Sequence, residues 1–434
     1  MTSMNIFPEI SAHRLRNGLL VLTAEIHSLP ILSHQVHFAA GSRYEKPGIT
    51  GISHLFEHLM FKGTHRVKPE EFARIIQAHG GTLNAFTTTD NTSYYENLPA
   101  EKLELAMDLE ADRLANLQLN SETLEPEREV VRSERKLRSV NSPFGLLIEQ
   151  LSALAYEQHP YRWPVIGWDA DLRTLTLEDC REYYRTHYAP NNAALVVVGD
   201  VAAEEVFRLA EKFYGPIPSQ PAPRPLITPE RSQRGEKRAV FKKVSQVAAF
   251  FAAFHIPGIA HADLIPLQIL CTVLSSGRSS IFFQKFEKPG KAVEAQAEMG
   301  SPPFFFMDPG LLQIYAIASP GFPLEKLEGE IWDEVDALRR DLLPAEILLK
   351  AKKQVRSAFL QSLQTHFFKG LLAGIYQVRA GDYRHLYQIL SRYECVTAEE
   401  VLQAARKYLR LENRTVVSLQ PVTQAEHDAL GEIE

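Results

Sequence analysis

The chain has 434 residues, more than one hydrophobic core usually supports, which favours two domains. Hydrophobic residues make up 45% of the sequence and charged residues 23%, a globular balance that excludes a disordered or fibrous chain. The net charge of −6, with no basic stripe, disfavours nucleic acid as the partner.

The cysteines and apolar segments set further limits. Cys180, Cys271 and Cys395 lie far apart without a CxxC pair, which disfavours a disulfide framework and a thiolate zinc site. The opening MTSMNIFPEISAHRL lacks an apolar segment after a basic start, so we expect a cytoplasmic location, with a periplasmic one as the alternative if a leader was removed. No apolar run approaches the ~20 residues that cross a bilayer, so no membrane span is expected.

The first candidate site is a histidine pair with a glutamate beside it. The helical pattern from Ile52 to Phe61 contains an HxxEH motif formed by His54, Glu57 and His58. A spacing of four residues places both imidazoles on one helix face, where they can bind a single cation. Glu57 points toward the same region and can take a proton from water at that cation. The order is the reverse of HExxH.

A catalytic zinc site uses three protein ligands and keeps a fourth position for water, so a further carboxylate is expected. The charged segment Pro126–Arg138, PEREVVRSERKLR, predicts a helix with Glu127, Glu129 and Glu134. Glu127 and Glu134 are seven residues apart and share one helix face, so one can bind the metal while the other supports the site. Glu129 is expected to be a solvated charge.

Two segments 221 residues apart predict the same local structure. They are TLEDCREYYRTHYAPNNAALVVV, which begins at Thr176, and TAEEVLQAARKYLRLENRTVVSL, which begins at Thr397. Each predicts a threonine-capped helix, a turn that contains an asparagine (Asn192 or Asn413), and an apolar strand. The helix-to-strand ending therefore occurs twice, as expected for two homologous domains.

Each half also begins with strands followed by a helix. GLLVLTAEI and ILSHQVHFAAG precede the helix at 52–61, and AVFKK and VAAFFAAFHI precede a helix near 264–274. This pattern predicts an α+β fold, in which helices pack on a largely antiparallel sheet in each half. Between the halves, the proline density of Gly215–Lys237 favours an extended linker. We place a first domain at 1–218, a linker at 219–237 and a second domain at 238–434.

Together these motifs resemble the pitrilysin family of inverzincin zinc metallopeptidases, and especially its members similar to the mitochondrial processing peptidase. The resemblance covers nearly the whole chain. It rests on HLFEHLMFKGT around the histidine pair, GGTLNAFTTTDNTSYY (80–95), EREVVRSE (127–134), HPYRWPVIG (159–167) and YAPNNAALVVVGD (188–200).

The resemblance implies a zinc-dependent endopeptidase with one Zn²⁺ per chain. It assigns His54, His58 and Glu134 to the metal and Glu57 to the general base. It gives Glu127 a supporting role behind the ligands. It also matches four residues to the edge strand on which an extended peptide substrate adds, namely Asn84, Ala85, Phe86 and Thr87.

In this family, two homologous halves form one half of a clamshell that encloses peptides or unfolded segments, so the resemblance implies a second subunit. Members often carry an arginine and a tyrosine in a segment that reads GRSSIFFQKFEKPGKAV here (277–293). Glu287 stands at the arginine position and Val293, after a one-residue shortening, at the tyrosine position. We therefore expect a heterodimer in which a homologous partner supplies the Arg/Tyr pair. A homodimer that uses Arg278 or another residue is the alternative.

The alternative to an enzyme is a non-catalytic structural subunit of a processing-peptidase-like complex, because relatives that have lost their zinc residues occur as scaffolds. The complete set of candidate metal and base residues favours the enzyme. The motifs do not specify which peptide is cut.

Overall fold

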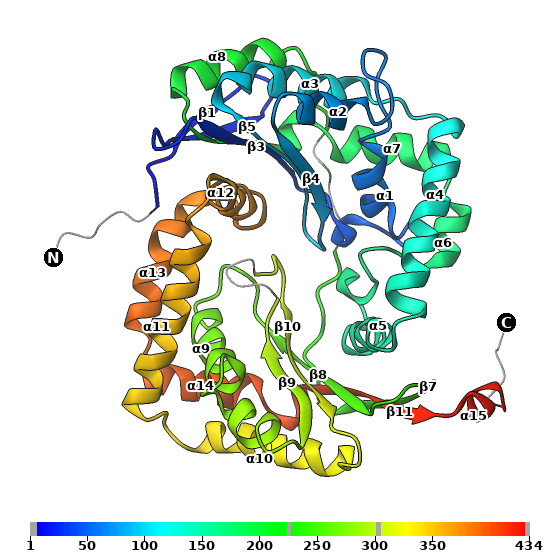
Figure 1. The fold of residues 1–434 in the computed structure, drawn as a ribbon, viewed down its shortest axis with the longest axis vertical. Coiled ribbons are helices and arrows are strands. Elements are labelled where there is room, and N and C mark those ends of the chain that lie inside the picture. Colours follow the sequence, from blue (N-terminus) through cyan, green and yellow to red (C-terminus); the bar gives the residue numbers. More distant parts are fainter. Residues whose placement is uncertain (1–6, 222, 224–226, 301–304, 430–434) are drawn as a thin grey trace. The chain divides into compact units, whose positions relative to one another are not determined.

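The computed structural model describes residues 7–221, 223, 227–300 and 305–429 (Figure 1). Contacts within the chain divide it into two compact units. Unit 1 comprises Met1–Arg135, Trp163–Ile227 and Phe359–Gln388, and unit 2 comprises Lys136–Arg162, Thr228–Ala358 and Ile389–Glu434. Each unit therefore takes one segment from the other half of the sequence. Residues 222 and 224–226 of the predicted linker lie outside the described residues, and the predicted domain boundaries stay a prediction.

A six-stranded sheet forms the centre of unit 1. Its strands are β1 (Ser11–Arg14), β2 (Leu20–Glu25), β3 (Ile31–Phe38), β4 (Thr82–Thr87), β5 (Thr92–Pro99) and β6 (Ala193–Gly199). Their order is β1-β2-β6-β3-β5-β4, and all neighbours are antiparallel except β2 and β6. Among the described strands, β4 pairs with β5 alone and so forms an edge of the sheet.

Helices cover both faces of this sheet. They are α1 (Ile52–Leu59), α2 (Glu71–Ala78), α3 (Leu103–Asn116), α4 (Ser121–Arg135), α6 (Asp169–Thr174), α7 (Leu177–His187), α8 (Ala203–Phe213) and α12 (His366–Ala380). The main apolar core joins β3 and β6 to α1, α3, α7 and α8. Helix α12 packs against β3 and β6 on the opposite side of the sheet from α3 and α8 (Figure 1).

Unit 2 is built on a five-stranded sheet. Its strands are β7 (Lys237–Val244), β8 (Ala249–Ile256), β9 (Ala292–Glu298), β10 (Gly310–Ala318) and β11 (Arg414–Val422), in the order β7-β11-β8-β10-β9. Among these five described strands, β7 and β11 alone pair in parallel. The helices of this unit are α5 (Pro143–Ala155), α9 (Leu264–Ser275), α10 (Leu324–Arg340), α14 (Ala398–Tyr408) and α15 (Gln424–Ala429). Helices α11 (Ala345–Ser362) and α13 (Leu386–Cys395) have residues in both units.

The predicted repeat and the predicted α+β class are confirmed. Helices α7 and α14 both begin with a capping box, formed by Thr176 with Asp179 and by Thr397 with Glu400. In the turns that follow, the Nδ2 atoms of the two asparagines donate to equivalent carbonyl oxygens at 2.8 Å, Asn192 to His187 and Asn413 to Tyr408. Each turn leads into a buried strand, β6 or β11. Within the described residues, every helix falls short of the length or apolarity that crossing a membrane requires.

A polar layer lies between α12 and the sheet of unit 1. Nδ1 of His37 contacts the Ser93 hydroxyl at 2.8 Å, and its Nε2 contacts Oε1 of Gln35 at 3.0 Å. The helix approaches so closely that a Cβ at Gly374 would lie 2.1 Å from Cδ2 of His37. Burial, assisted by the charge of Arg379, lowers the pKa of His37 to about 3. His37 is therefore neutral in the folded chain at any pH above that value.

This burial predicts a loss of stability in acid. The unfolded chain protonates His37 below its ordinary pKa of 6.5, whereas the folded chain does so only near pH 3, so stability falls as the pH drops between these values. At pH 5 the loss from this one side chain is about 2 kcal/mol. Urea unfolding at pH 7.5 and 5.0 should show that His37→Gln loses about 2 kcal/mol less than the wild type. His79→Gln, at an exposed histidine, is the control; equal acid losses in the wild type and both variants would contradict the account.

Candidate metal centre

Helix α1 has an amphipathic pattern that fixes its rotation. Its apolar side is fully buried in the core of unit 1 and comprises Ile52, Leu55, Phe56 and Leu59. Burial of each of these side chains contributes roughly 1.5–3 kcal/mol. Phe56 also stacks on Tyr183 and Tyr184 of α7, with ring centroids 5.8 Å apart in both pairs. These contacts leave His54 and His58 on the side of α1 that packs against α4.

Helix α4 begins earlier than predicted. It runs from Ser121 to Arg135 and contains Pro126, whereas the sequence predicts a helix that begins at this proline and ends at Arg138. Proline favours the first turn of a helix, yet Pro126 lies in the second turn of α4. Here Asn120 supplies the cap instead, since its Oδ1 accepts the N–H of Thr123 at 3.0 Å. An Asn-x-x-Thr pattern ahead of the proline was the missed signal.

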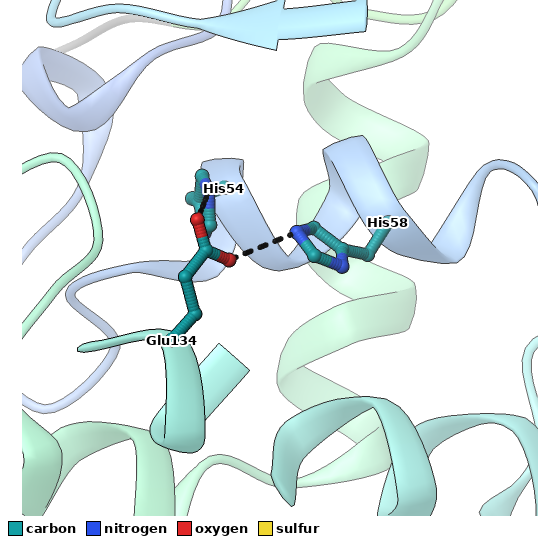
Figure 2. Close-up of side chains that lie close together, drawn as sticks. All are labelled: His54, His58 and Glu134. Carbon is teal, nitrogen blue, oxygen red and sulfur yellow. Dashed lines mark ion pairs between the residues drawn. The ribbon is translucent and has the colours of Figure 1, made fainter. Parts of the chain in front are cut away.

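The three predicted ligands converge. Nε2 of His54 lies 3.8 Å from Oε1 of Glu134, and Nε2 of His58 lies 3.4 Å from its Oε2. Figure 2 shows the Glu134 carboxylate, which comes from α4, between the two imidazoles of α1. One donor atom from each residue lies within 4.8 Å of the other two.

The spacing of these atoms fits a zinc ion. Hydrogen bonds between imidazole and carboxylate would bring the heavy atoms to about 2.7–3.2 Å. Tetrahedral zinc with bonds of about 2.0–2.1 Å instead holds its ligand atoms about 3.4 Å apart. The observed separations of 3.4 and 3.8 Å, each to a different oxygen of the Glu134 carboxylate, are longer than such hydrogen bonds, and the three donor groups surround one point. Two imidazole nitrogens and one carboxylate oxygen are also a donor set that catalytic zinc sites use.

Glu127 lies behind the cluster and contacts His58. Nδ1 of His58 donates to Oε1 of Glu127 at 3.1 Å, and Nζ of Lys62 lies 2.5 Å from Oε2 of the same carboxylate. A proton held on Nδ1 leaves the lone pair of Nε2 directed toward Glu134. Burial lowers the pKa of His58, but the hydrogen bond and charge of Glu127, with the charges of Glu134 and Glu57, outweigh burial and raise it. Lys62 was not predicted, although it follows His58 by four residues, just beyond the end of α1.

The remaining predicted residues lie on α1 and β4. Glu57 is half-buried, and its charge contributes to the raised pKa of its neighbour His58. Asn84 to Thr87 form most of the edge strand β4, which packs against α1. Oδ1 of Asn84 accepts the N–H of Ala85 at 2.8 Å, so a side chain occupies this main-chain donor.

A second cluster of similar composition lies deeper in unit 1 and was not predicted. Donor atoms of His34, Glu96 and Glu110 also come within 4.8 Å of one another. Protein groups already occupy these atoms: Nδ1 of His34 contacts Glu96 at 2.8 Å, and Nε of Arg113 donates to Glu110 at 3.2 Å. The Arg113 guanidinium supplies the positive charge, so this cluster is a buried ionic network and not a candidate metal site.

Known proteins resemble the chain over nearly its whole length. Residues 20–168 match the family described as Insulinase (Peptidase family M16), and residues 174–355 match Peptidase M16 inactive domain. Zinc protease PqqE of Helicobacter pylori is 29% identical over 426 residues, which cover 97% of this chain and 95% of that protein. A probable mitochondrial-processing peptidase subunit beta of Arabidopsis thaliana is 25% identical over 425 residues, which cover 96% and 79%. The crystal structure of a protease from Helicobacter pylori has a TM-score of 0.91 and 28% identity, and the match covers 96% of this chain and 100% of that one.

The contact with Glu127 predicts how the pKa of His58 in the metal-free protein responds to a substitution. Its pKa should lie above 6.5, and Glu127→Gln should lower it, because the variant removes the negative charge that the imidazolium faces. Histidine Cε1–H signals in an NMR titration measure this pKa. Glu129→Gln is the matched control, since Glu129 is exposed on the same helix and pairs with Arg132. An unchanged pKa in Glu127→Gln would contradict the assignment.

Proposed function

The chain belongs to the M16 family of peptidases, with a domain of each of the family's two types, and we propose that it is a zinc-dependent endopeptidase. This membership confirms the resemblance to the pitrilysin family. The observation that carries the proposal is the convergence of His54, His58 and Glu134 at separations that suit one zinc ion. Zinc fits these donors, and relatives of the chain are named zinc proteases.

The chemistry follows from the placement of the side chains. A bound zinc ion would polarise the scissile carbonyl and lower the pKa of a water molecule to about 7. Glu57 would accept the proton that this water loses as its oxygen attacks the carbonyl carbon, and would pass that proton to the leaving amine nitrogen. Glu127 would keep Nδ1 of His58 protonated and hold the imidazole in place.

The edge strand β4 supports a peptide substrate bound in extended form. A free strand edge can pair with another chain through main-chain hydrogen bonds, which recognise a peptide with little regard to its side chains. The N–H of Ala85 now meets Oδ1 of Asn84, and a substrate carbonyl would take over this donor. Such binding suits peptides or unfolded segments, because a folded protein seldom offers a free strand.

Two substitutions separate metal binding from proton transfer. Glu57→Gln should retain zinc and lower kcat by roughly 10²–10⁴-fold, because only the base is lost. Glu134→Gln should weaken zinc binding itself, because a neutral amide replaces a charged ligand. Metal analysis of the purified chain, calorimetric zinc titration and chelator-sensitive cleavage of a quenched peptide measure these effects, with Glu129→Gln as the control.

Two outcomes would count against the proposal. Normal cleavage by Glu57→Gln would mean that the assigned base is wrong. Absence of both zinc and cleavage, even with a homologous partner added, would favour a non-catalytic structural subunit.

We also propose that the active form is a heterodimer with a homologous subunit that supplies the arginine and tyrosine. Oε1 of Glu287 accepts the N–H of Ala295 in β9 at 3.1 Å, so a negative charge is held where the family pattern has a positive one. Val293 is 58% exposed and offers no hydrogen-bonding group. One relative is, by name, the beta subunit of a processing peptidase. The alternative is a homodimer.

Activity of the purified chain alone tests this assembly. It should be roughly 10²-fold or more below that of the chain with its partner, since donors that stabilise the developing oxyanion are missing. Combining Glu287→Arg with Val293→Tyr should raise the activity of the chain alone. Glu287→Arg with Val293→Phe is the matched control, because it lacks only the phenol hydroxyl. Full activity of the wild type as a homodimer in size-exclusion fractions would rule out the partner.

A further inference from the structure

Helix α1 is too short to be stable without contacts from the rest of unit 1. An isolated helix of fewer than about 12–15 residues is marginal in water, and α1 has eight. Its N-cap residue, Gly51, has a φ of 89° and no side chain to accept a hydrogen bond, and its first turn contains no acidic residue. The main-chain groups at both ends therefore need partners from outside the helix.

Glu45 supplies the partner at the N-terminal end. It follows a short 3₁₀ turn (Ser42–Tyr44) and is 6% exposed. Its Oε2 accepts the N–H of Gly51 at 2.8 Å, and its Oε1 accepts the N–H of Ser53 at 2.9 Å. The carboxylate also places a negative charge at the positive end of the helix dipole. Burial raises the pKa of Glu45 to about 7 against the effect of these hydrogen bonds, so keeping a carboxylate here is costly.

Tyr94 supplies the partner at the other end. Its side chain comes from β5 and is fully buried. The hydroxyl donates to the carbonyl oxygen of Phe56 at 3.0 Å, and this oxygen also accepts the N–H of Met60, the residue after α1, at 3.1 Å. The guanidinium carbon of Arg113 lies 4.6 Å from the centre of the ring and fixes the ring in place.

The backbone at the start of α1 packs closely against the backbone of residues 166 and 167. A Cβ at Gly51 would lie 2.5 Å from the carbonyl oxygen of Ile166, and a Cβ at Gly167 would lie 2.3 Å from that of Thr50. Oδ2 of Asp171 accepts the N–H and the hydroxyl of Thr50 at 3.2 and 2.7 Å. The HPYRWPVIG segment thus ends in a close backbone contact with the residues that lead into the helix.

We propose that Glu45 and Tyr94 are positioning residues that set the register of α1, so that its two histidines face Glu134. The inference rests on the proposed function, because it concerns the same metal site. Ligand groups must be held to within about 0.5 Å of the productive geometry, and one helix face can meet this demand only if the helix cannot slide or rotate. Glu45 binds main-chain N–H groups that precede His54, and Tyr94 binds a main-chain carbonyl that follows it.

The test uses Glu45→Gln and Tyr94→Phe, which keep the side-chain volume, with Co²⁺ in place of zinc. The visible absorption of Co²⁺ reports the geometry of its ligands, and a titration gives its affinity. Both variants should bind Co²⁺ about 10–100-fold more weakly, as changes behind metal ligands commonly do. The absorption spectrum should change, and kcat should fall in the active assembly while KM is retained.

Glu328→Gln is the matched control, because Glu328 is about as buried as Glu45 and accepts hydrogen bonds from Arg238 and Trp332, but it belongs to unit 2 and contacts no N–H of α1. It should lower the melting temperature and leave the Co²⁺ spectrum unchanged. Unchanged Co²⁺ affinity, spectrum and kcat in both test variants would overturn the inference, whatever their melting temperatures. If Glu45→Gln does not fold, Glu45→Asp and Tyr94→Phe decide by the same criteria. A wild-type chain that binds neither Co²⁺ nor zinc would overturn the proposed function, and the inference with it.

Discussion

Two imidazoles on one short helix need a further donor from elsewhere to complete a three-ligand zinc site. In this chain the carboxylate comes from α4, more than seventy residues after His58. The relation between α1 and α4 therefore governs the site. The buried apolar side of α1, the tyrosines of α7 and the contacts at both helix ends all limit how α1 can lie against α4. The core of unit 1 therefore determines where His54 and His58 lie, because both side chains belong to α1.

Two clusters of histidine and glutamate in unit 1 have similar composition and different chemistry. Around His34, the Arg113 guanidinium provides positive charge beside two buried carboxylates; it donates to Glu110, and Nδ1 of His34 contacts Glu96. Around His54 and His58, the imidazole and carboxylate atoms stand slightly too far apart for such hydrogen bonds. Residue types alone do not separate the two clusters; the Arg113 guanidinium bonded to Glu110 marks the one around His34 as an ionic network.

The features that could be predicted from the sequence are those encoded by local residue patterns. The spacing of His54, Glu57 and His58, the threonine caps and the alternating strands are each encoded within a few residues, so the α+β class, the repeat and the histidine face followed. Glu45 and Tyr94 could not be found this way, because a buried carboxylate and a buried phenol leave no periodic signal, and their partners are main-chain atoms. Lys62 and the Asn120 cap of α4 do carry local signals, namely the spacing of four residues from His58 and the Asn-x-x-Thr pattern.

The exchange of segments between the units affects what a break in the backbone would do. Residues 359–388, which include the helix packed over His37, follow the proline-rich region, and residues 136–162, which include a helix of unit 2, precede it. Proteolytic nicking in that region would produce two polypeptides, neither of which contains a whole unit. Unit 1 would then consist of two chains held by non-covalent contacts such as those of α12 with β3 and β6. A gene split at this point would have to express both products together.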